Sequence, residues 1–251
     1  MTPERTIRVF PSPDDLAVTA AALFSETARA AASARGEFRV CLAGGSTPKT
    51  LYRRLAGDLG RDVPWPSVCV YFGDERCVPP DHPDSIYGMA RAALLDRVPV
   101  RPECIFRIPG EFGLGTASDA YEQTLRETLA AADGRFDLVL LGLGADGHTA
   151  SLFPNTPALH VTDRWCVGAV APVVPKERIT LTLPILNAAR RIVFLVTGKE
   201  KADAVRAVLC GPRDPDRLPA QAIQPIDGSF FWLLDESAAS DLPQSLGIRR
   251  S

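Results

Sequence analysis

The sequence predicts an α/β fold, a mainly parallel β-sheet with helices on both faces. Short apolar runs alternate with longer segments rich in alanine, leucine and glutamate, which is typical of repeated strand–helix units. One run, 136-FDLVLLGLG-144, is typical of a central parallel strand covered on both faces. The 251 residues are 46 % hydrophobic and 23 % charged, and this globular balance predicts a single domain over residues 1–251.

The first elements are marked by their breakers. We expect 7-IRVF-10 to be a short apolar strand. The alanine-rich segment that follows predicts a helix to about Ala34, with Asp14 or Asp15 near its N-cap. The run 38-FRVCLAG-44 predicts a buried strand that ends at a pair of glycines.

The next elements repeat the pattern. A helix is expected from Thr47 to Leu55, because Pro48 occupies a first-turn position that proline favours. The run 68-VCVYFGDER-76 predicts another strand. After a proline-rich loop, a helix is expected over about 85–95.

The middle of the chain adds a short strand over 104–108 and a helix over 116–132, the latter from its alanine, leucine and glutamate content. After the central run come two apolar strands, 165–170 and 178–184. A short helix is expected around 184–190. These elements continue the alternation that an α/β sheet requires.

The last part of the chain predicts a strand over 191–198 and a helix over 199–209. The proline- and aspartate-rich stretch 211–220 is typical of a surface loop within the domain. The segment 230-FFWLLDESAAS-240 predicts a final strand followed by a turn of helix.

Composition excludes several classes of protein. A net charge of −2 gives no basic field for nucleic acid or an anionic membrane surface, so local groups must meet any anionic ligand. The apolar runs are too short to span a bilayer, and the N-terminal residues show no apolar signal-peptide core. Six scattered cysteines without a CxxC pair indicate free thiols in a cytoplasmic enzyme. Three histidines, none near another or near a cysteine cluster, predict no protein-made metal site.

Candidate functional residues follow the apolar runs, because ligands of open parallel sheets bind beyond the carboxyl ends of the strands. In 43-AGGSTPKTLYRRL-55, Gly44 and Gly45 would let backbone N–H groups approach an anion closely. Ser46 and Thr47 would add hydroxyls at the positive end of a helix, which suits a phosphate monoester. The same letters also fit a tight turn capped by serine or threonine.

Asp74 and Arg76, in the sequence GDER, are expected to point the same way if the strand persists to them. Arg76 could then bind a phosphate through both guanidinium arms, while Asp74 orients a group or binds a sugar hydroxyl. An ordinary surface ion pair just past a strand is the other interpretation of these two residues.

Asp146 and His148 lie in a loop with three glycines directly after the central strand. A histidine with an ordinary pKa of about 6.5 can act as a general base at neutral pH, and a nearby carboxylate can fix its tautomer. The stretch 149-TASLFP-154 resembles a helical turn whose N–H groups could meet a developing negative charge. His82 and His160 have loop surroundings and are expected at the surface.

Further cations follow late in the chain. Arg178 opens a strand, with Lys176 two residues before it, and Lys201 begins a helix, where a lysine is unfavourable unless an anion is near. Solvation is the alternative explanation for these cations, and it is the one expected for Lys199.

These stretches together resemble one family. The chain is similar to the 6-phosphogluconolactonase family in LAGGSTPKTLY, YFGDERCVPPDHPDS, FDLVLLGLGADGHTASLFP and PKERITLTLPILNAARRIVFLVTGKEKADAVRAVL, in this order over about residues 7–236. The family shares its Rossmann-like fold with glucosamine-6-phosphate deaminase. The resemblance implies hydrolysis of 6-phospho-D-glucono-1,5-lactone to 6-phosphogluconate, the second step of the oxidative pentose phosphate pathway, with no metal and no organic cofactor.

The resemblance also implies roles for residues. His148 would activate water with support from Asp146, and Asp74 falls at an active-site position of the family. Positions where the family handles substrate and phosphate are occupied by Gly45, Ser46, Thr47, Arg76, Arg178 and Lys201.

One segment departs from the family. Ile86-Tyr87-Gly88 stands where the family often has Asn-Tyr-Arg, so a ligand contact from this helix is not expected. We expect a monomer or a weak homodimer that acts on a small sugar-phosphate lactone.

Two alternatives remain. A deaminase or isomerase of amino-sugar phosphates would need a carboxylate after the histidine, and 149–154 contains none. A sensor that binds the sugar phosphate without catalysis would not need the Asp146–His148 pair.

Overall fold

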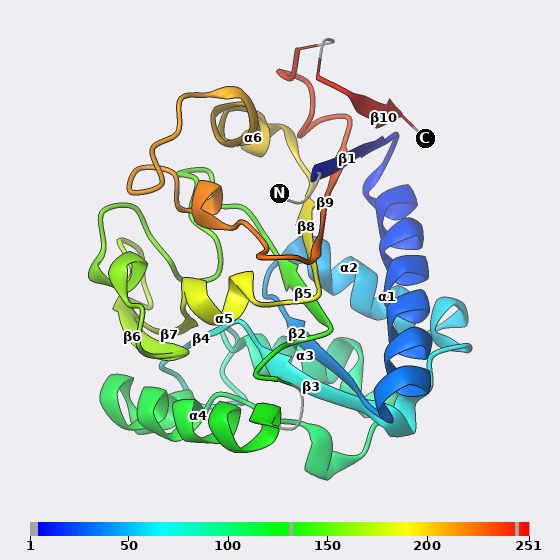
Figure 1. Ribbon diagram of the computed structural model, residues 1–251, viewed down its shortest axis with the longest axis vertical. Helices are drawn as coiled ribbons and strands as arrows, with labels where there is room; N and C mark the ends of the chain where they lie inside the picture. The colour runs from blue at the N-terminus through cyan, green and yellow to red at the C-terminus, as the bar shows by residue number, and fades with distance from the viewer. Residues whose placement is uncertain (1–4, 131–132, 244–245, 251) are drawn as a thin grey trace.

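The computed structural model describes residues 5–130, 133–243 and 246–250. Its main sheet has seven strands in the order β10-β1-β9-β8-β5-β2-β3, and all neighbours are parallel (Figure 1). The strands of this sheet are β1 Arg5–Phe10, β2 Phe38–Leu42, β3 Val68–Phe72, β5 Leu138–Leu141, β8 Arg191–Val196, β9 Ser229–Asp235 and β10 Ile248–Arg250. The prediction of a mainly parallel sheet is therefore confirmed.

A second, antiparallel sheet of three strands stands beside the first, in the order β4-β7-β6. Its strands are β4 Asp74–Arg76, β6 Cys166–Val170 and β7 Glu177–Leu181. The sequence analysis expected one continuous strand over 68–76, and this was wrong because the chain changes sheet at Gly73. The N–H of Gly73 donates to Leu42 O in the main sheet (2.9 Å), and its carbonyl accepts from Leu181 N in the second (2.8 Å).

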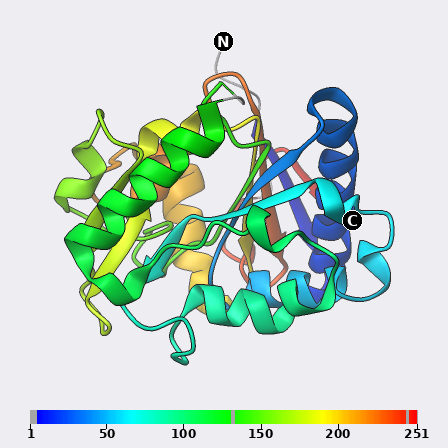
Figure 2. The ribbon, with the colours of Figure 1, turned by 90° about the horizontal axis from the view of Figure 1, so that it is seen from below.

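Helices cover both faces of the main sheet, as predicted. The α-helices of the described residues are α1 Pro13–Arg35, α2 Ser46–Leu55, α3 Ile86–Ala93, α4 Leu114–Leu129, α5 Leu183–Asn187 and α6 Ala202–Cys210. In Figure 1, α1 and α2 lie on one side of the sheet, and α6 lies on the other together with the second sheet. Helix α4 packs on β6 and β7, and Figure 2 shows it from below at the side of the molecule opposite α1. Among the described residues, no helix is long and apolar enough to cross a membrane.

Three local predictions were wrong. Residues 104–108 form no strand: a 3₁₀ turn covers Pro102–Cys104, and Ile105 makes one isolated bridge to β3. Residues 149–152 form a tight turn closed by a bridge between its ends, not a turn of helix. Strand β10 was missed, because three residues are too few to show a pattern.

The termini of α1 show why this helix is so clearly bounded. Ser12 is the N-cap, and its hydroxyl accepts from Asp15 N at 3.2 Å, while Asp14 and Asp15 lie in the first turn, where negative charge is favourable. The helix ends at Gly36, whose φ of 79° is the left-handed conformation that glycine adopts at little cost.

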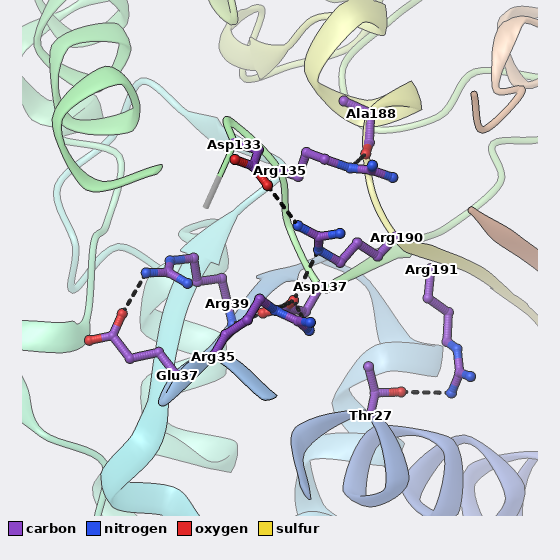
Figure 3. A network of polar contacts seen from close by, with 10 residues as sticks. All are labelled: Thr27, Arg35, Glu37, Arg39, Asp133, Arg135, Asp137, Ala188, Arg190 and Arg191. Carbon is purple, nitrogen blue, oxygen red and sulfur yellow. Dashed lines mark hydrogen bonds and ion pairs between the residues drawn. The ribbon is translucent and has the colours of Figure 1, made fainter. Parts of the chain in front are cut away.

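A buried carboxylate, Asp137, lies just before β5, at the end of the main sheet where the strands begin (Figure 3). Its side chain is 2 % exposed and accepts from Arg35 Nη2 at 2.6 Å and from Arg39 N at 2.8 Å. Arg190, which precedes β8, forms an ion pair with it at 3.6 Å. One carboxylate thus joins the end of α1 to the starts of three neighbouring strands. The cleft described below lies at the other end of these strands.

Candidate active site

A cleft of about 310 Å³ opens at the carboxyl ends of β2, β3 and β5, between the two sheets. A smaller lobe of about 120 Å³ adjoins it, and the two share Gly44, Gly45, Gly142, Leu143 and Lys201. Of the predicted site residues, the cleft and the lobe are lined by Gly44, Gly45, Ser46, Thr47, Asp74, Arg76, His148 and Lys201. The prediction that these separated loops converge is therefore met by the geometry.

Two predicted residues do not line the cleft but lie next to residues that do. Asp146 does not line the cleft but contacts His148, and Arg178 is 5 % exposed and stands opposite Arg76. His82 and His160 lie outside the cleft, where each faces an aspartate at the surface, as predicted. Within the described residues, no group of three or more His, Cys, Asp and Glu side chains is placed to hold a metal ion.

The Asp146–His148 pair is built by the backbone of a tight loop. Gly144 N donates to His148 O at 2.8 Å, and Gly147 has a φ of 83°, which turns the chain back toward the cleft. Asp146 Oδ1 then lies 2.5 Å from His148 Nδ1 and also accepts from His148 N at 3.1 Å. A carboxylate acceptor keeps the proton on Nδ1, so Nε2 carries the free lone pair of the neutral ring.

The charge state of Asp146 follows from these contacts. Partial burial acts to raise the pKa of its carboxyl group, but the N–H, the charge and the ring hydrogen bond of His148 outweigh this and hold the pKa below its ordinary value. Asp146 is therefore ionised at neutral pH and can stabilise a protonated imidazole beside it.

Gly144 makes room for the imidazole. A Cβ on this residue would lie 2.0 Å from His148 Nδ1 and 2.6 Å from Asp146 Oδ1, so the ring rests directly on the glycine backbone. The ring of Phe153 lies at a centroid distance of 4.5 Å from the imidazole. The sequence analysis noted Gly144 only as one of three loosening glycines. A glycine that seats a side chain four residues later leaves no signal in a single sequence.

Asp74 is buried, 9 % exposed, and lines the cleft. Its Oδ2 accepts from Ser151 Oγ at 2.6 Å, while Ser151 N donates to Thr180 Oγ1 at 3.1 Å. Ser151 thus links the His148 loop to the second sheet. Among the described residues, Asp74 and Arg76 form no ion pair, so the surface ion pair is not observed. The expected helical turn is absent here, and the N–H groups of Ser151 and Leu152 are already engaged, so they are not free to bind an oxyanion.

Arg76 and Arg178 stand directly opposite each other on the antiparallel strands β4 and β7. Like charges in this position repel, and within the described residues neither side chain forms an ion pair, while both Nε atoms are buried without a hydrogen-bond partner. Burial, followed by the nearness of Arg76, lowers the pKa of Arg178. Asp74, Asp84 and Glu75 lie near enough to oppose this fall, but none forms an ion pair with either guanidinium group, and two such groups facing each other have the chemistry to bind an anion.

Glu75, between the two predicted residues, was missed by the sequence analysis. It points to the other side of β4, is 2 % exposed, and accepts from Ile86 N at 2.8 Å and Tyr87 N at 2.7 Å. Its carboxylate therefore caps the start of α3 and fixes this helix against β4. Burial raises the pKa of Glu75, and the backbone N–H groups of Tyr87 and Ile86 oppose the rise.

The start of α3 also explains the departure from the family pattern. Ile86 packs so closely on the glycine loop that a Cβ on Gly44 would lie 2.7 Å from Ile86 Cδ1. A Cβ on Gly88 would lie 2.6 Å from Pro80 O, so this packing leaves no room for a side chain at position 88. The apolar Ile86 lines the cleft in place of a polar contact.

The smaller lobe lies at the start of α2. Gly45 precedes the helix with a φ of 107°, and no side chain caps the helix, so its first N–H groups face the lobe. Thr47 Oγ1 lies 2.7 Å from the hydroxyl of Thr197, a residue that the sequence analysis did not single out. Lys201 borders both cavities, whereas Lys199 forms an ion pair with Asp241 at the surface.

Known proteins were compared with the chain. The model of the family "Glucosamine-6-phosphate isomerases/6-phosphogluconolactonase" matches residues 11–232. A 6-phosphogluconolactonase of Nostoc sp. is 41 % identical over 95 % of this chain and 99 % of its own length. The human 6-phosphogluconolactonase is 38 % identical over 93 % of this chain and 92 % of its own.

Solved structures agree with these relatives. The 6-phosphogluconolactonase of Trypanosoma brucei superposes with a TM-score of 0.83 at 29 % identity, over 96 % of this chain and 99 % of that one. A monomeric glucosamine-6-phosphate deaminase superposes with a TM-score of 0.80 at 24 % identity, over 94 % and 99 % of the two chains, and shares the fold. The chain therefore belongs to the glucosamine-6-phosphate isomerase/6-phosphogluconolactonase family, which is a family of enzymes.

Proposed function

We propose that this chain hydrolyses 6-phospho-D-glucono-1,5-lactone to 6-phosphogluconate, with His148 as the general base. The observation that carries the proposal is the contact of His148 Nδ1 with Asp146 in a cleft that also holds Asp74 and Arg76. The activity named for the curated relatives supports the same reaction, which would belong to the oxidative pentose phosphate pathway.

The reaction divides into two proton transfers. Nε2 of His148 takes a proton from a water molecule as its oxygen attacks C1 of the lactone, and Asp146 stabilises the imidazolium that forms. When the tetrahedral intermediate collapses, the bond between C1 and the ring oxygen breaks, and the imidazolium returns its proton to that oxygen. A general base contributes about 10²–10⁴-fold to the rate, which is substantial for an ester that water already opens slowly.

The phosphate group would be the part of the substrate that is bound far from the reacting carbon. We assign it to the cationic groups around the cleft, namely the Arg76–Arg178 pair and Lys201. The hydroxyls of Ser46 and Thr47 and the uncapped start of α2 add hydrogen-bond donors in the small lobe. Binding an anion neutralises the repulsion between the two arginines, and the fixed phosphate holds C1 near the imidazole.

The experiment compares lactone hydrolysis with the spontaneous rate for the wild type, for His148→Asn and for His160→Asn. The second variant is a matched control, because His160 also faces an aspartate, Asp216 at 3.3 Å, but lies outside the cleft. His148→Asn should fold normally and lose most of kcat, while His160→Asn should keep it. Near-normal turnover by His148→Asn would show that the base is another group.

The same assay separates the rival activity. Residues 149–154 contain no carboxylate that could assist the ring opening of an amino sugar, so no ammonia should be released from glucosamine 6-phosphate. Ammonia release at the rate of lactone hydrolysis would favour the deaminase. Binding of 6-phosphogluconate without any acceleration of lactone decay would favour a sensor.

We also infer that residues 1–251 act as one unit, as a monomer or weak homodimer in the cytoplasm. Light scattering after gel filtration gives the mass directly, to be compared with 27.0 kDa for one chain. A mass of four or more chains at micromolar concentration would contradict this inference.

A further inference from the structure

A second cavity, of about 350 Å³, lies on the α6 side of the main sheet and shares no lining residue with the cleft. It is formed where β1 and β9 begin, so it sits toward the opposite end of these strands from the catalytic loops. The end of α6 and the segment that follows this helix complete its wall, on the side of the sheet where Figure 1 shows α6. We call it the basal pocket, and its volume is in the usual range of small-molecule sites, about 300–1,000 Å³.

The wall of the basal pocket is apolar and rigid. Val208, Ile223, Phe230 and Trp232 line it, and each is at most 8 % exposed. The indole of Trp232 stacks on Phe194 with ring centroids 4.0 Å apart and planes at 4°. Such a wall accepts a flat apolar body without rearrangement, which lowers the cost of binding.

One polar atom in this wall lacks a partner. Trp232 Nε1 is buried and has no hydrogen bond within the described residues, although the residue is only 1 % exposed. A buried donor without an acceptor costs free energy, and such groups are rare in folded proteins. Nε1 is itself covered, so it lies behind the surface of the wall, while the rest of the indole lines the pocket.

Two guanidinium groups border the same pocket. Arg5 Nη2 donates to Leu209 O at 3.2 Å, and Arg213 Nη1 donates to Gln221 O at 3.3 Å. Within the described residues neither arginine forms an ion pair, and no acidic residue lines the pocket. The two carbonyls hold the guanidinium groups in place without cancelling their charge.

We propose that the basal pocket binds a small aromatic anion, with its ring on the apolar wall and its carboxylate or sulfonate on Arg5 and Arg213. The apolar wall and the two cations without ion-pair partners select for the same chemistry, a flat body that carries one negative group. A sugar phosphate lacks the flat apolar part, so the pocket and the cleft select different ligands.

The binding test uses 8-anilino-1-naphthalenesulfonate, titrated into the full chain and followed by its fluorescence. Saturable one-site binding is expected, and Arg5→Gln and Arg213→Gln should each weaken it about tenfold, as for the loss of a hydrogen bond to a charged group. Arg206→Gln is the matched control, because Arg206 is an exposed arginine of α6 that does not line the pocket, and it should bind as the wild type does. The uncharged N-phenyl-1-naphthylamine should bind the wild type and the Arg variants alike.

A second measurement locates the dye. The indole N–H signal of Trp232 is assigned in a ¹⁵N-labelled sample with the aid of Trp232→Phe, and it should shift on titration, while those of Trp65 and Trp165 stay in place. The proposal is overturned if the Arg5 and Arg213 variants bind like the wild type, if Arg206→Gln binds as weakly as they do, or if the Trp232 signal does not move. Displacement of the dye by 6-phosphogluconate would place it in the cleft and would overturn the proposal as well.

Discussion

The substitution Gly144→Ala puts a methyl group into the space that the imidazole of His148 occupies. The new Cβ would lie 2.0 Å from His148 Nδ1, 2.2 Å from His148 Cε1 and 2.6 Å from Asp146 Oδ1, whereas ordinary contact begins at 3.4 Å. The ring must therefore withdraw by about 1.4 Å, and the carboxylate must move as well. A misplacement of about 1 Å near the reacting atoms costs roughly 10²-fold in rate.

The fold should tolerate this substitution. Gly144 is not among the glycines with a positive φ, so alanine can adopt its backbone conformation. The side chains it displaces are partly exposed, 30 % for His148 and 42 % for Asp146, and they can swing toward solvent at little cost. We expect kcat to fall about 10²-fold while the unfolding midpoint in urea changes little.

The assay is steady-state lactone hydrolysis, corrected for spontaneous opening, with urea unfolding on the same samples. Gly142→Ala is the matched control in the same loop: a Cβ there would meet no protein atom within 4 Å and would leave His148 in place. Because Gly142 lines the cleft, its effect is expected on KM, and kcat should be retained. A kcat for Gly144→Ala within a factor of two of the wild type would refute the packing argument. Equal losses in both variants would show that the loop, and not the imidazole contact, is what alanine disturbs.

Three further outcomes are expected. Asp137→Asn should lower the free energy of unfolding by about 2–3 kcal/mol and leave kcat unchanged. The loss is less than the ~3–5 kcal/mol of a fully buried pair, because the arginine partners of Asp137 are about one-third exposed. A urea midpoint equal to that of the wild type would contradict this. The lowered pKa of Asp146 stabilises the fold at pH values above the ordinary carboxyl pKa of 3.8, and this contribution is lost as pH falls through the lowered value. The wild type should therefore exceed Asp146→Asn in stability by more at pH 7 than at pH 3. A difference in stability that does not depend on pH would exclude the linkage. Arg76→Ala should raise KM for the phosphorylated lactone far more than for glucono-1,5-lactone, and equal effects on both substrates would reject its role in phosphate binding.

The sequence was sufficient for those parts of the fold that local patterns encode. Apolar runs and glycine or proline breakers located all the strands of the main sheet except β10, and the six helices, because burial and backbone conformation act on consecutive residues. The change of sheet at Gly73 could not be read, since the letters on both sides of it suit an extended chain. Which strands pair, and in which sheet, depends on contacts between residues far apart in the chain.

The candidate site shows the same division. The convergence of the glycine loop, GDER and the Asp146–His148 loop follows from the rule that ligands bind beyond the carboxyl ends of parallel strands. What supports them could not be predicted: Glu75 caps a helix eleven residues later, and Ser151 reaches Asp74 across 77 positions. Their roles depend on hydrogen bonds that only the folded chain brings together, so one sequence shows them as ordinary polar residues.

Because the chain changes sheet at Gly73, the imidazole of His148 and the two arginines are positioned by different sheets. His148 follows a strand of the large sheet, whereas Arg76 and Arg178 belong to the small one, which rests on α4. Substitutions beneath the small sheet therefore shift the two arginines relative to His148, and Ser151, which bonds to Asp74 and Thr180, is the point at which such a shift is passed to the His148 loop. Repacking α4 would thus change the distance between the imidazole and the two guanidinium groups through a helix that does not line the cleft.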